Sequence, residues 1–111
     1  MSDSDNGFAG RAYVVSGGTQ GIGAAVAVAL AGSGAGGVVI CGRHEENGAR
    51  VKSAVEAIGC ACEYVRADLA EADDCRAVTA ACDRRFGRLD GLVNAAGITD
   101  RGTIENTSVE L

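Results

Sequence analysis

Short apolar runs recur along the chain, separated by longer stretches of mixed composition. They lie at 12–16, 38–41, 60–66 and 92–93. The first two are almost continuously apolar, which is typical of strands covered on both faces. The third contains more polar residues, so we expect it at an edge of the sheet.

Between these runs, apolar residues recur at helical spacing and predict three helices. Their apolar positions are Ile22, Val26, Ala29 and Leu30, then Val51, Val55 and Ile58, then Val78, Cys82 and Phe86. Glycines at 32–37, Gly59 and Gly87 are expected to end them. Alternating strands and helices predict an α/β fold with a doubly wound parallel sheet and right-handed crossovers.

Composition and charge further limit the number of domains, the partners and the location expected for this chain. The 111 residues suffice for one domain, and 47% hydrophobic residues can form its core. We expect residues 1–10 to be a flexible acidic leader and 11–111 to form the domain. The net charge of −5 argues against nucleic acid or an anionic membrane as partner. Without a membrane-length apolar run or a basic N-terminus, the expected location is cytoplasmic.

The cysteines do not form a recognisable metal or disulfide pattern. They are odd in number, contain no Cys-x-x-Cys pair, and lie at Cys41, Cys60, Cys62, Cys75 and Cys82. His44 is the only histidine, and we expect it at the surface. We therefore predict buried, reduced thiols and no metal site.

The glycine-rich stretch Ser16–Gly23 follows the first strand and opens onto the first helix. Glycines at 17, 21 and 23 permit a sharp turn and leave no β-carbon between the backbone amides and a phosphate. The helix that follows directs its free N–H groups and positive dipole end at the same point. A diphosphate cradle is the favoured interpretation, and a loose glycine loop is the alternative.

Arg43 stands just beyond the second strand, where dinucleotide-binding folds usually place an acidic residue that holds the ribose hydroxyls. An arginine instead pairs with a 2′-phosphate and can stack on adenine, which favours NADP(H) over NAD(H). Glu45 and Glu46 follow closely and would oppose that phosphate. The alternative is a solvated arginine at a strand end.

Two further strand ends carry candidate site residues. Asp68 follows the third strand, where its carboxylate could accept a hydrogen bond from the adenine amino group or cap the helix after it. The stretch Asn94–Gly97 follows the fourth strand, and its small residues would let a nicotinamide ribose approach the backbone. A simple strand-to-loop turn is the alternative for this stretch.

Together these motifs resemble the classical short-chain dehydrogenase/reductase family, from about Phe8 to Leu111. Ser16–Gly23 is similar to its Thr-Gly-x-x-x-Gly-x-Gly motif, with Ser in place of Thr, and Asn94–Gly97 to its Asn-Asn-Ala-Gly motif. Asp68 falls on its adenine-contacting Asp, and Arg43 on the basic position of NADP-preferring members. Such members often carry a second basic residue where this chain has Gln20.

The resemblance implies a Rossmann-type sheet of about four strands, in the order 3-2-1-4, and a role for each motif residue. The implied cofactor-binding residues are Ser16, Gly17, Thr19, Gln20, Gly21, Ile22 and Gly23 for the diphosphate segment, Arg43 for the 2′-phosphate, Asp68 and Leu69 for adenine, and Asn94, Ala95 and Gly97 for the inner ribose. In the complete protein, hydride would pass between NADP(H) and an alcohol or carbonyl substrate. Full-length relatives are expected to form homo-oligomers.

The residues that this family uses for catalysis do not have counterparts here. A Ser and a Tyr-x-x-x-Lys pair are required, the tyrosine passing a proton to the carbonyl oxygen. Four residues after the two tyrosines, Tyr13 and Tyr64, stand Gly17 and Asp68, and Lys52 is the sole lysine. We assign no catalytic residue and expect this chain alone to be inactive.

The last residues, Thr107–Leu111, read as a helix start with Thr107 or Ser108 as N-cap. Because family members are typically more than twice this length, we expect a truncated chain: a fragment, a split protein, a degraded gene or a short splice product. Its fourth strand would be a bare edge through which the chain self-associates. The alternatives are a non-catalytic NADP-binding module, acting as sensor or regulatory subunit, and a non-functional truncated product.

Overall fold

Five strands and three helices make up the fold. The computed structural model describes residues 9–17, 21–68, 71–95 and 109–110. The elements are β1 (Ala12–Ser16), α1 (Gly21–Gly32), β2 (Gly37–Gly42), α2 (Glu45–Ala57), β3 (Ala61–Arg66), α3 (Ala72–Phe86), β4 (Gly91–Asn94) and β5 (Val109–Glu110). The strands and helices predicted up to residue 95 are all present, with boundaries within a few residues of those expected.

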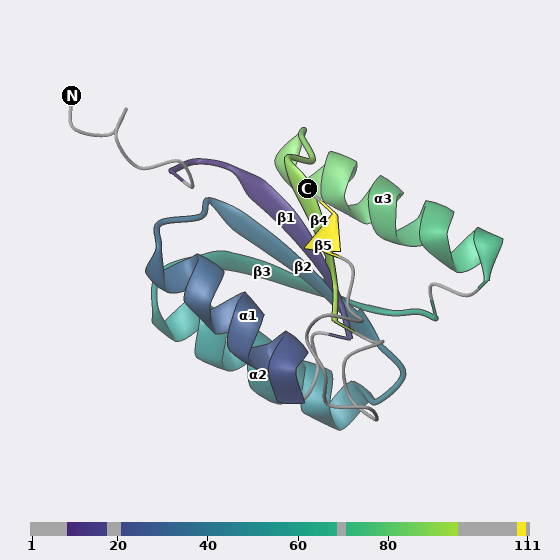
Figure 1. Ribbon diagram of the computed structural model, residues 1–111, viewed down its shortest axis with the longest axis horizontal. Helices are drawn as coiled ribbons and strands as arrows, with labels where there is room; N and C mark the ends of the chain where they lie inside the picture. The colour runs from purple at the N-terminus through teal and green to yellow at the C-terminus, as the bar shows by residue number, and fades with distance from the viewer. Residues whose placement is uncertain (1–8, 18–20, 69–70, 96–108, 111) are drawn as a thin grey trace.

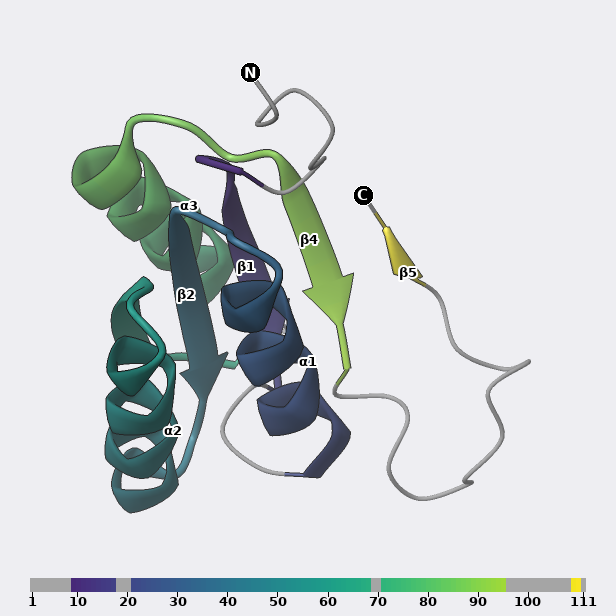
Figure 2. The ribbon, with the colours of Figure 1, turned by 90° about the vertical axis from the view of Figure 1, so that its left-hand side faces the viewer.

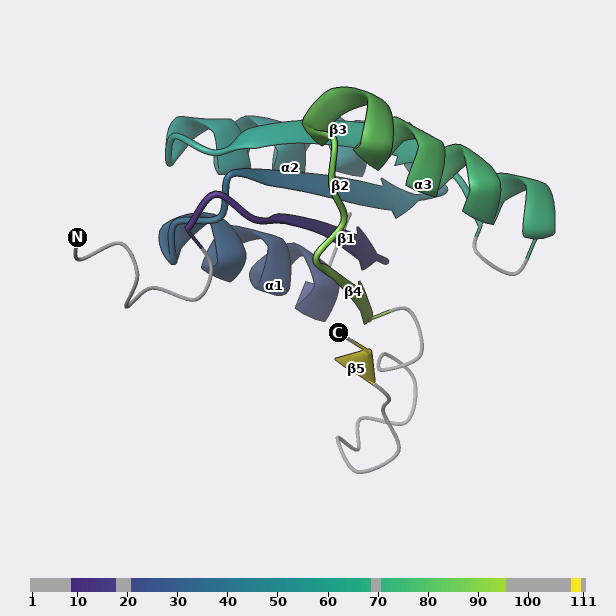
Figure 3. The ribbon, with the colours of Figure 1, turned by 90° about the horizontal axis from the view of Figure 1, so that it is seen from above.

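One sheet contains all five strands in the order β3-β2-β1-β4-β5. β1, β2, β3 and β4 are parallel, as Figure 3 shows for β1 and β2, whose arrowheads lie on the same side. The predicted order 3-2-1-4 is therefore confirmed, and β3 lies at the edge where its mixed composition placed it. At its last residue, β1 pairs Ser16 with Cys41 on one side and Asn94 on the other.

Helices cover both faces of the sheet, with α1 and α2 on one side and α3 on the other (Figure 1). Because side chains alternate along a strand, each strand supplies both cores. Val15 and Ile40 pack in the core under α1 and α2, whereas Val14 and Val39 pack in the core under α3. The doubly wound architecture is thus confirmed.

Helix α1 packs on the sheet through a different face from the one predicted. Gly23, Ala27 and Ala31 are buried together with Leu30, whereas Ile22 remains 44% exposed. The helix is apolar almost throughout, so the spacing of its larger side chains does not single out a face. Its smallest residues face the sheet and allow a close approach, which the sequence pattern alone did not reveal.

The other two helices bury the faces predicted for them, apart from one residue. Val51 and Val55 of α2 are buried, and Val78 and Cys82 of α3 are buried. Ile58 was expected on the buried face of α2 but is 46% exposed, because the helix ends at Ala57 and Ile58 is its C-cap.

The predicted helix start at 107–111 is wrong where the structure describes it. Val109–Glu110 form β5, which pairs antiparallel with β4 by placing Val109 beside Val93 and Glu110 beside Leu92. The edge of β4 is therefore partly covered and is not bare as expected. The open edge of β4 offers partners for backbone hydrogen bonds, and this long-range pairing is not encoded in the local capping residues.

Asp90 ties the amino ends of β1 and β4 together. Its Oδ2 accepts hydrogen bonds from the Ala12 amide at 2.8 Å and from Arg88 Nε at 2.7 Å, and its own amide donates to the Ala12 carbonyl at 2.8 Å. The Arg88 guanidinium and the Ala12 amide lower the pKa of this carboxyl to about 2. Asp90 therefore stays ionised in all but strong acid and holds the two strands at a fixed offset.

Burial of the thiols agrees with the sequence interpretation. None of the five cysteines forms a disulfide, and Cys75 alone among them is not fully buried. Burial raises the pKa of Cys41 to about 11 and that of Cys62 to about 12. In the described part of the chain, no helix combines the length and the apolar character that crossing a membrane requires.

Gly37 allows α3 to approach the start of β2. A β-carbon at Gly37 would overlap the Phe86 ring, so Gly37→Ala is expected to destabilise the fold by about 1–3 kcal/mol through overpacking. Gly32→Ala is the matched control, since a β-carbon there meets no atom within 4 Å. Urea denaturation followed by circular dichroism measures both, and an equal effect of the two variants would contradict this packing.

The thiol pKa values predict an order of chemical modification. Iodoacetamide near neutral pH should label Cys75 first, because the folded chain keeps Cys41 and Cys62 buried and protonated. Mass spectrometry of timed samples reports the labelled positions, and the urea-unfolded chain, which should react at all five, is the control. Rapid labelling of Cys41 in the folded chain would show that β2 is not buried as described.

Candidate functional site

β1, β2 and β4 finish at the same end of the sheet, where their carboxyl ends form the carboxyl edge. In Figure 2 the arrowheads of β2 and β4 both point toward the end of the molecule at which α1 begins. Backbone hydrogen bonds hold the residues just beyond the strands, with Gly17 donating to the Cys41 carbonyl at 3.0 Å and Ala95 donating to the Ser16 carbonyl at 2.9 Å. This is the edge at which ligands of open parallel sheets lie.

The glycine-rich segment turns here from β1 into α1. Gly17 and Gly21 have φ angles of +75° and +60°, which residues with a side chain rarely adopt. A β-carbon on Gly21 would meet no atom within 4 Å, so the space beside it is open. The first turn of α1 carries no acidic residue, which leaves its positive end uncompensated. Thr19 and Gln20, also assigned to this segment, lie outside the described residues.

Ser16 and Cys41 are paired neighbours at the carboxyl edge of the sheet. Ser16 is only 4% exposed, and its hydroxyl hydrogen-bonds the Cys41 sulfur. Burial raises the Cys41 pKa despite this bond, so the thiol is a packing group and not a nucleophile. Ser16 therefore packs at the start of the glycine-rich segment. In the first turn of α1, Ile22 is exposed and Gly23 is buried.

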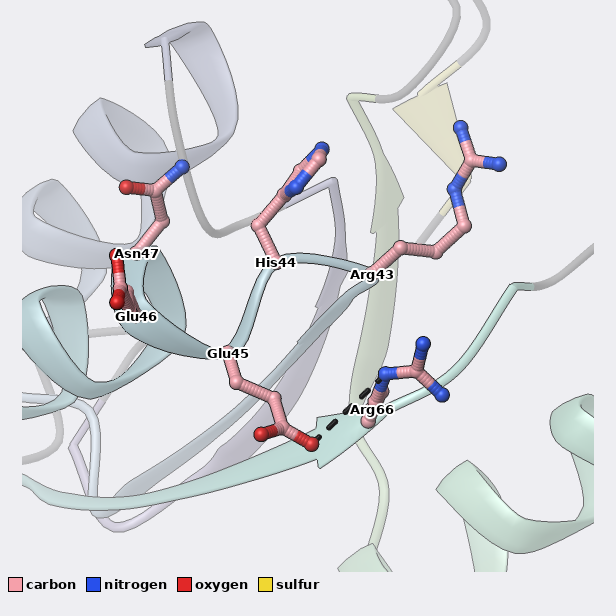
Figure 4. A pocket seen from close by; sticks show the side chains of 6 residues that line it. All are labelled: Arg43, His44, Glu45, Glu46, Asn47 and Arg66. Carbon is pink, nitrogen blue, oxygen red and sulfur yellow. Dashed lines mark ion pairs between the residues drawn. The ribbon is translucent and has the colours of Figure 1, made fainter.

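Arg43 lies directly after β2 and lines an open pocket of about 500 Å³ (Figure 4). The residues that line this pocket are Arg43, His44, Glu45, Glu46, Asn47 and Arg66. His44 is exposed and is the N-cap of α2, without a side-chain capping bond. Its predicted place at the surface is confirmed, and nothing prepares it for catalysis.

Arg66 is a charged pocket residue that the sequence motifs do not include. It is the last residue of β3, and its Nε lies 3.8 Å from Oε2 of Glu45, a contact drawn in Figure 4. Both side chains are largely exposed, at 66% and 72%. The pairing of β3 with β2 places Arg66 in the pocket, because Arg66 pairs with Gly42, the residue immediately before Arg43.

Tyr64 braces the junction between β2 and α2. Its hydroxyl donates a hydrogen bond to the Gly42 carbonyl at 2.8 Å, and its ring lies against Gly48 of α2. Burial first, and the Glu45 carboxylate second, raise its pKa above the usual value. Tyr13, the other tyrosine, is 5% exposed in the core under α1 and α2.

Asp68 follows the end of β3, at the carboxyl edge of the sheet. Its amide donates to Asp74 Oδ2 at 2.8 Å, and its carbonyl accepts from the Glu71 amide at 2.9 Å. The N-cap of α3 is Glu71, so the alternative that made Asp68 the cap residue is not realised at that position. Leu69, its expected companion at adenine, lies outside the described residues.

Asn94 and Ala95 lie at the carboxyl end of β4. Asn94 is exposed at the last position of the strand, and Ala95 is buried at 1%. Gly97 lies outside the described residues. The structure therefore brings the ends of β1 and β4 into contact and places Arg43 and Asp68 after the neighbouring strands. Among the described residues, no three His, Cys, Asp or Glu side chains are grouped to hold a metal ion.

Comparison with known proteins agrees with this geometry. The profile of the short chain dehydrogenase family matches residues 11–111. A 3beta-hydroxysteroid dehydrogenase of Mediterraneibacter gnavus is 42% identical over 91 residues, which are 82% of this chain. The match covers 33% of that relative, so the chain spans about a third of its length.

Solved structures of the same kind superpose on the chain. A metagenomic short-chain oxidoreductase in complex with NADP has a TM-score of 0.70 and 34% identity, over 77% of this chain and 38% of that one. An NAD+-bound xylitol dehydrogenase has a TM-score of 0.73 over 78% of this chain and 33% of that one, and its 23% identity supports the fold alone. With the family profile matched from residue 11 onward, this chain belongs to the short-chain dehydrogenase family.

Proposed function

We propose that this chain supplies the NADP(H)-binding part of an oxidoreductase that interconverts an alcohol and a carbonyl compound. The observation that carries the preference for NADP(H) is Arg43, which follows β2 directly and lines the open pocket there. A carboxylate at this strand end would hold ribose hydroxyls and repel a 2′-phosphate, whereas a guanidinium pairs with the phosphate.

The carboxyl edge of the sheet has a shape that fits the other parts of a dinucleotide: the diphosphate, the adenine and the inner ribose. The left-handed turn at Gly17 and Gly21, the open space beside Gly21 and the start of α1 suit a diphosphate. We assign its binding to the segment that includes Ser16, Gly17, Thr19, Gln20, Gly21, Ile22 and Gly23. Asp68 and Leu69 would contact adenine, and Asn94, Ala95 and Gly97 would line the inner ribose.

The bound cofactor would supply or accept the hydride. The chain's own residues in this proposal bind and orient it: the glycine segment fixes the diphosphate, and the β4 end lets the nicotinamide ribose approach the backbone. The relative from Mediterraneibacter gnavus is named a dehydrogenase of a 3beta-hydroxysteroid, which is an alcohol. An alcohol or carbonyl compound is therefore the substrate class we propose.

Neither tyrosine of this chain is suited to the acid–base step. Tyr13 is buried in the core, and the Tyr64 hydroxyl already donates to the Gly42 carbonyl. The raised pKa of Tyr64 is the opposite of what proton transfer near neutral pH requires. We propose that this chain binds cofactor without turning it over.

Cofactor binding tests the proposal directly. NADPH should raise the melting temperature of the chain more than NADH, since a ligand at a hundredfold excess over its Kd adds about 2.7 kcal/mol to stability. Arg43→Gln should weaken NADPH binding about tenfold in calorimetry and leave NADH unchanged, because one charge-assisted contact is lost. Arg76→Gln, at an exposed ion pair on α3, is the control. Equal affinities for the two cofactors would refute the NADP(H) preference.

Turnover is tested separately. The chain mixed with NADPH and a panel of aldehydes and ketones should leave the absorbance of NADPH unchanged, while calorimetry on the same sample shows binding. The physical reason is that Tyr13 is buried in the core and the Tyr64 hydroxyl donates to the Gly42 carbonyl, so neither tyrosine can pass a proton to a substrate carbonyl. Oxidation of NADPH at a rate above the protein-free control would contradict the assignment of no catalytic residue.

A further inference from the structure

We infer that Arg66 is a second determinant of 2′-phosphate binding, acting beside Arg43, and that Glu45 is the counter-ion which the phosphate displaces. This rests on the proposed function, since it concerns the cofactor's 2′-phosphate. Arg66 stands in no sequence motif identified above, and it enters the pocket only through the pairing of β3 with β2.

The strand register places the two arginines together. Arg66 pairs with Gly42, so its backbone lies beside the residue that immediately precedes Arg43. Neighbouring strands are about 4.8 Å apart, which is well within the reach of two arginine side chains. Figure 4 shows both guanidinium groups on the same side of the pocket, away from Glu46 and Asn47.

The contact between Arg66 and Glu45 is one that a ligand can replace. Its shortest approach is 3.8 Å, from Arg66 Nε to Glu45 Oε2, between two side chains that are mostly exposed to solvent. Exposed pairs of this kind contribute little to stability. The separation exceeds hydrogen-bond distance, so no hydrogen bond to Glu45 has to be broken before the Arg66 guanidinium donates to a phosphate oxygen. A phosphate monoester carries nearly two negative charges and three acceptor oxygens, which makes it a stronger partner than one carboxylate.

The charges of the pocket require a second cation. Two glutamates, Glu45 and Glu46, line it together with Arg43 and Arg66. Without Arg66, one arginine would stand against the two glutamates that line the pocket, and the attraction for an incoming phosphate would be weaker. Gln20, at the position where NADP-preferring relatives often carry a basic residue, supplies no charge. Arg66 supplies that second charge from another strand.

The test uses ligands that differ only in the 2′-phosphate. Adenosine 2′,5′-bisphosphate and 5′-AMP, with NADP+ and NAD+, are titrated into the intact chain by calorimetry. Arg66→Gln should weaken the two 2′-phosphorylated ligands about tenfold, as expected for loss of one charge-assisted contact, and leave 5′-AMP and NAD+ unchanged. Arg76→Gln is the matched control, because it removes an exposed, ion-paired arginine that does not line the pocket.

Glu45→Gln gives an independent readout of opposite sign. Removing the competing carboxylate should tighten the 2′-phosphorylated ligands by about twofold to fivefold, the range expected for an exposed charge pair. An Arg66→Gln variant that keeps the wild-type ratio of NADP+ to NAD+ affinity, or loses both ligands equally, would overturn the role of Arg66 alone. If the wild-type chain binds none of the four ligands, the proposed function itself fails.

Discussion

The parallel pairing of β1 with strands on both sides is the constraint on which the rest of the structure depends. All five of its residues are buried, and its backbone pairs with β2 and with β4. A strand in that position must satisfy its polar backbone entirely within the sheet and cover both faces with helices. The continuous apolar sequence from Ala12 to Val15 is the consequence, and it excludes a one-sided sheet.

The site follows from the same pairing. Because Ser16 lies level with Cys41 and Asn94, the three strands end together, and the segments that leave them start at one edge. The segments that leave β1 and β4 are then fixed by backbone hydrogen bonds to the adjacent strands. The glycine turn and the β4 end consequently have defined positions relative to each other before any ligand arrives, which lowers the entropic cost of binding.

Sequence reasoning succeeded where a signal is local or strongly periodic. The strands, the helix ends at Gly59 and Gly87 and the glycine-rich turn depend on nearby residues, and the structure contains all of them. The buried face of α1 was not predictable, because Gly23, Ala27 and Ala31 pack by being small, and a hydrophobic pattern gives small residues little weight. Capping residues likewise suggested a helix at Thr107–Leu111, where long-range pairing with β4 produces a strand instead.

Arg66 and Tyr64 were missed for a related reason. Both lie on the edge strand, and what each contacts is set by the register between β3 and β2, which no local pattern specifies. Tyr64 reads from the sequence as an unassigned aromatic residue, yet its hydroxyl fixes the carbonyl one residue before Arg43. Site residues contributed by neighbouring strands become visible only once the pairing is known.

The exposure of the pocket limits how strongly it can discriminate between cofactors. Arg66 and Glu45 remain largely in solvent, where water and salt weaken each charge interaction. Discrimination by such a site comes from several modest contacts that add together and not from one desolvated ion pair. In the proposed function, two nearby glutamates would oppose the phosphate and the two arginines would attract it. Selectivity for NADP(H) would then be a small difference between opposing charges, and it would depend on ionic strength.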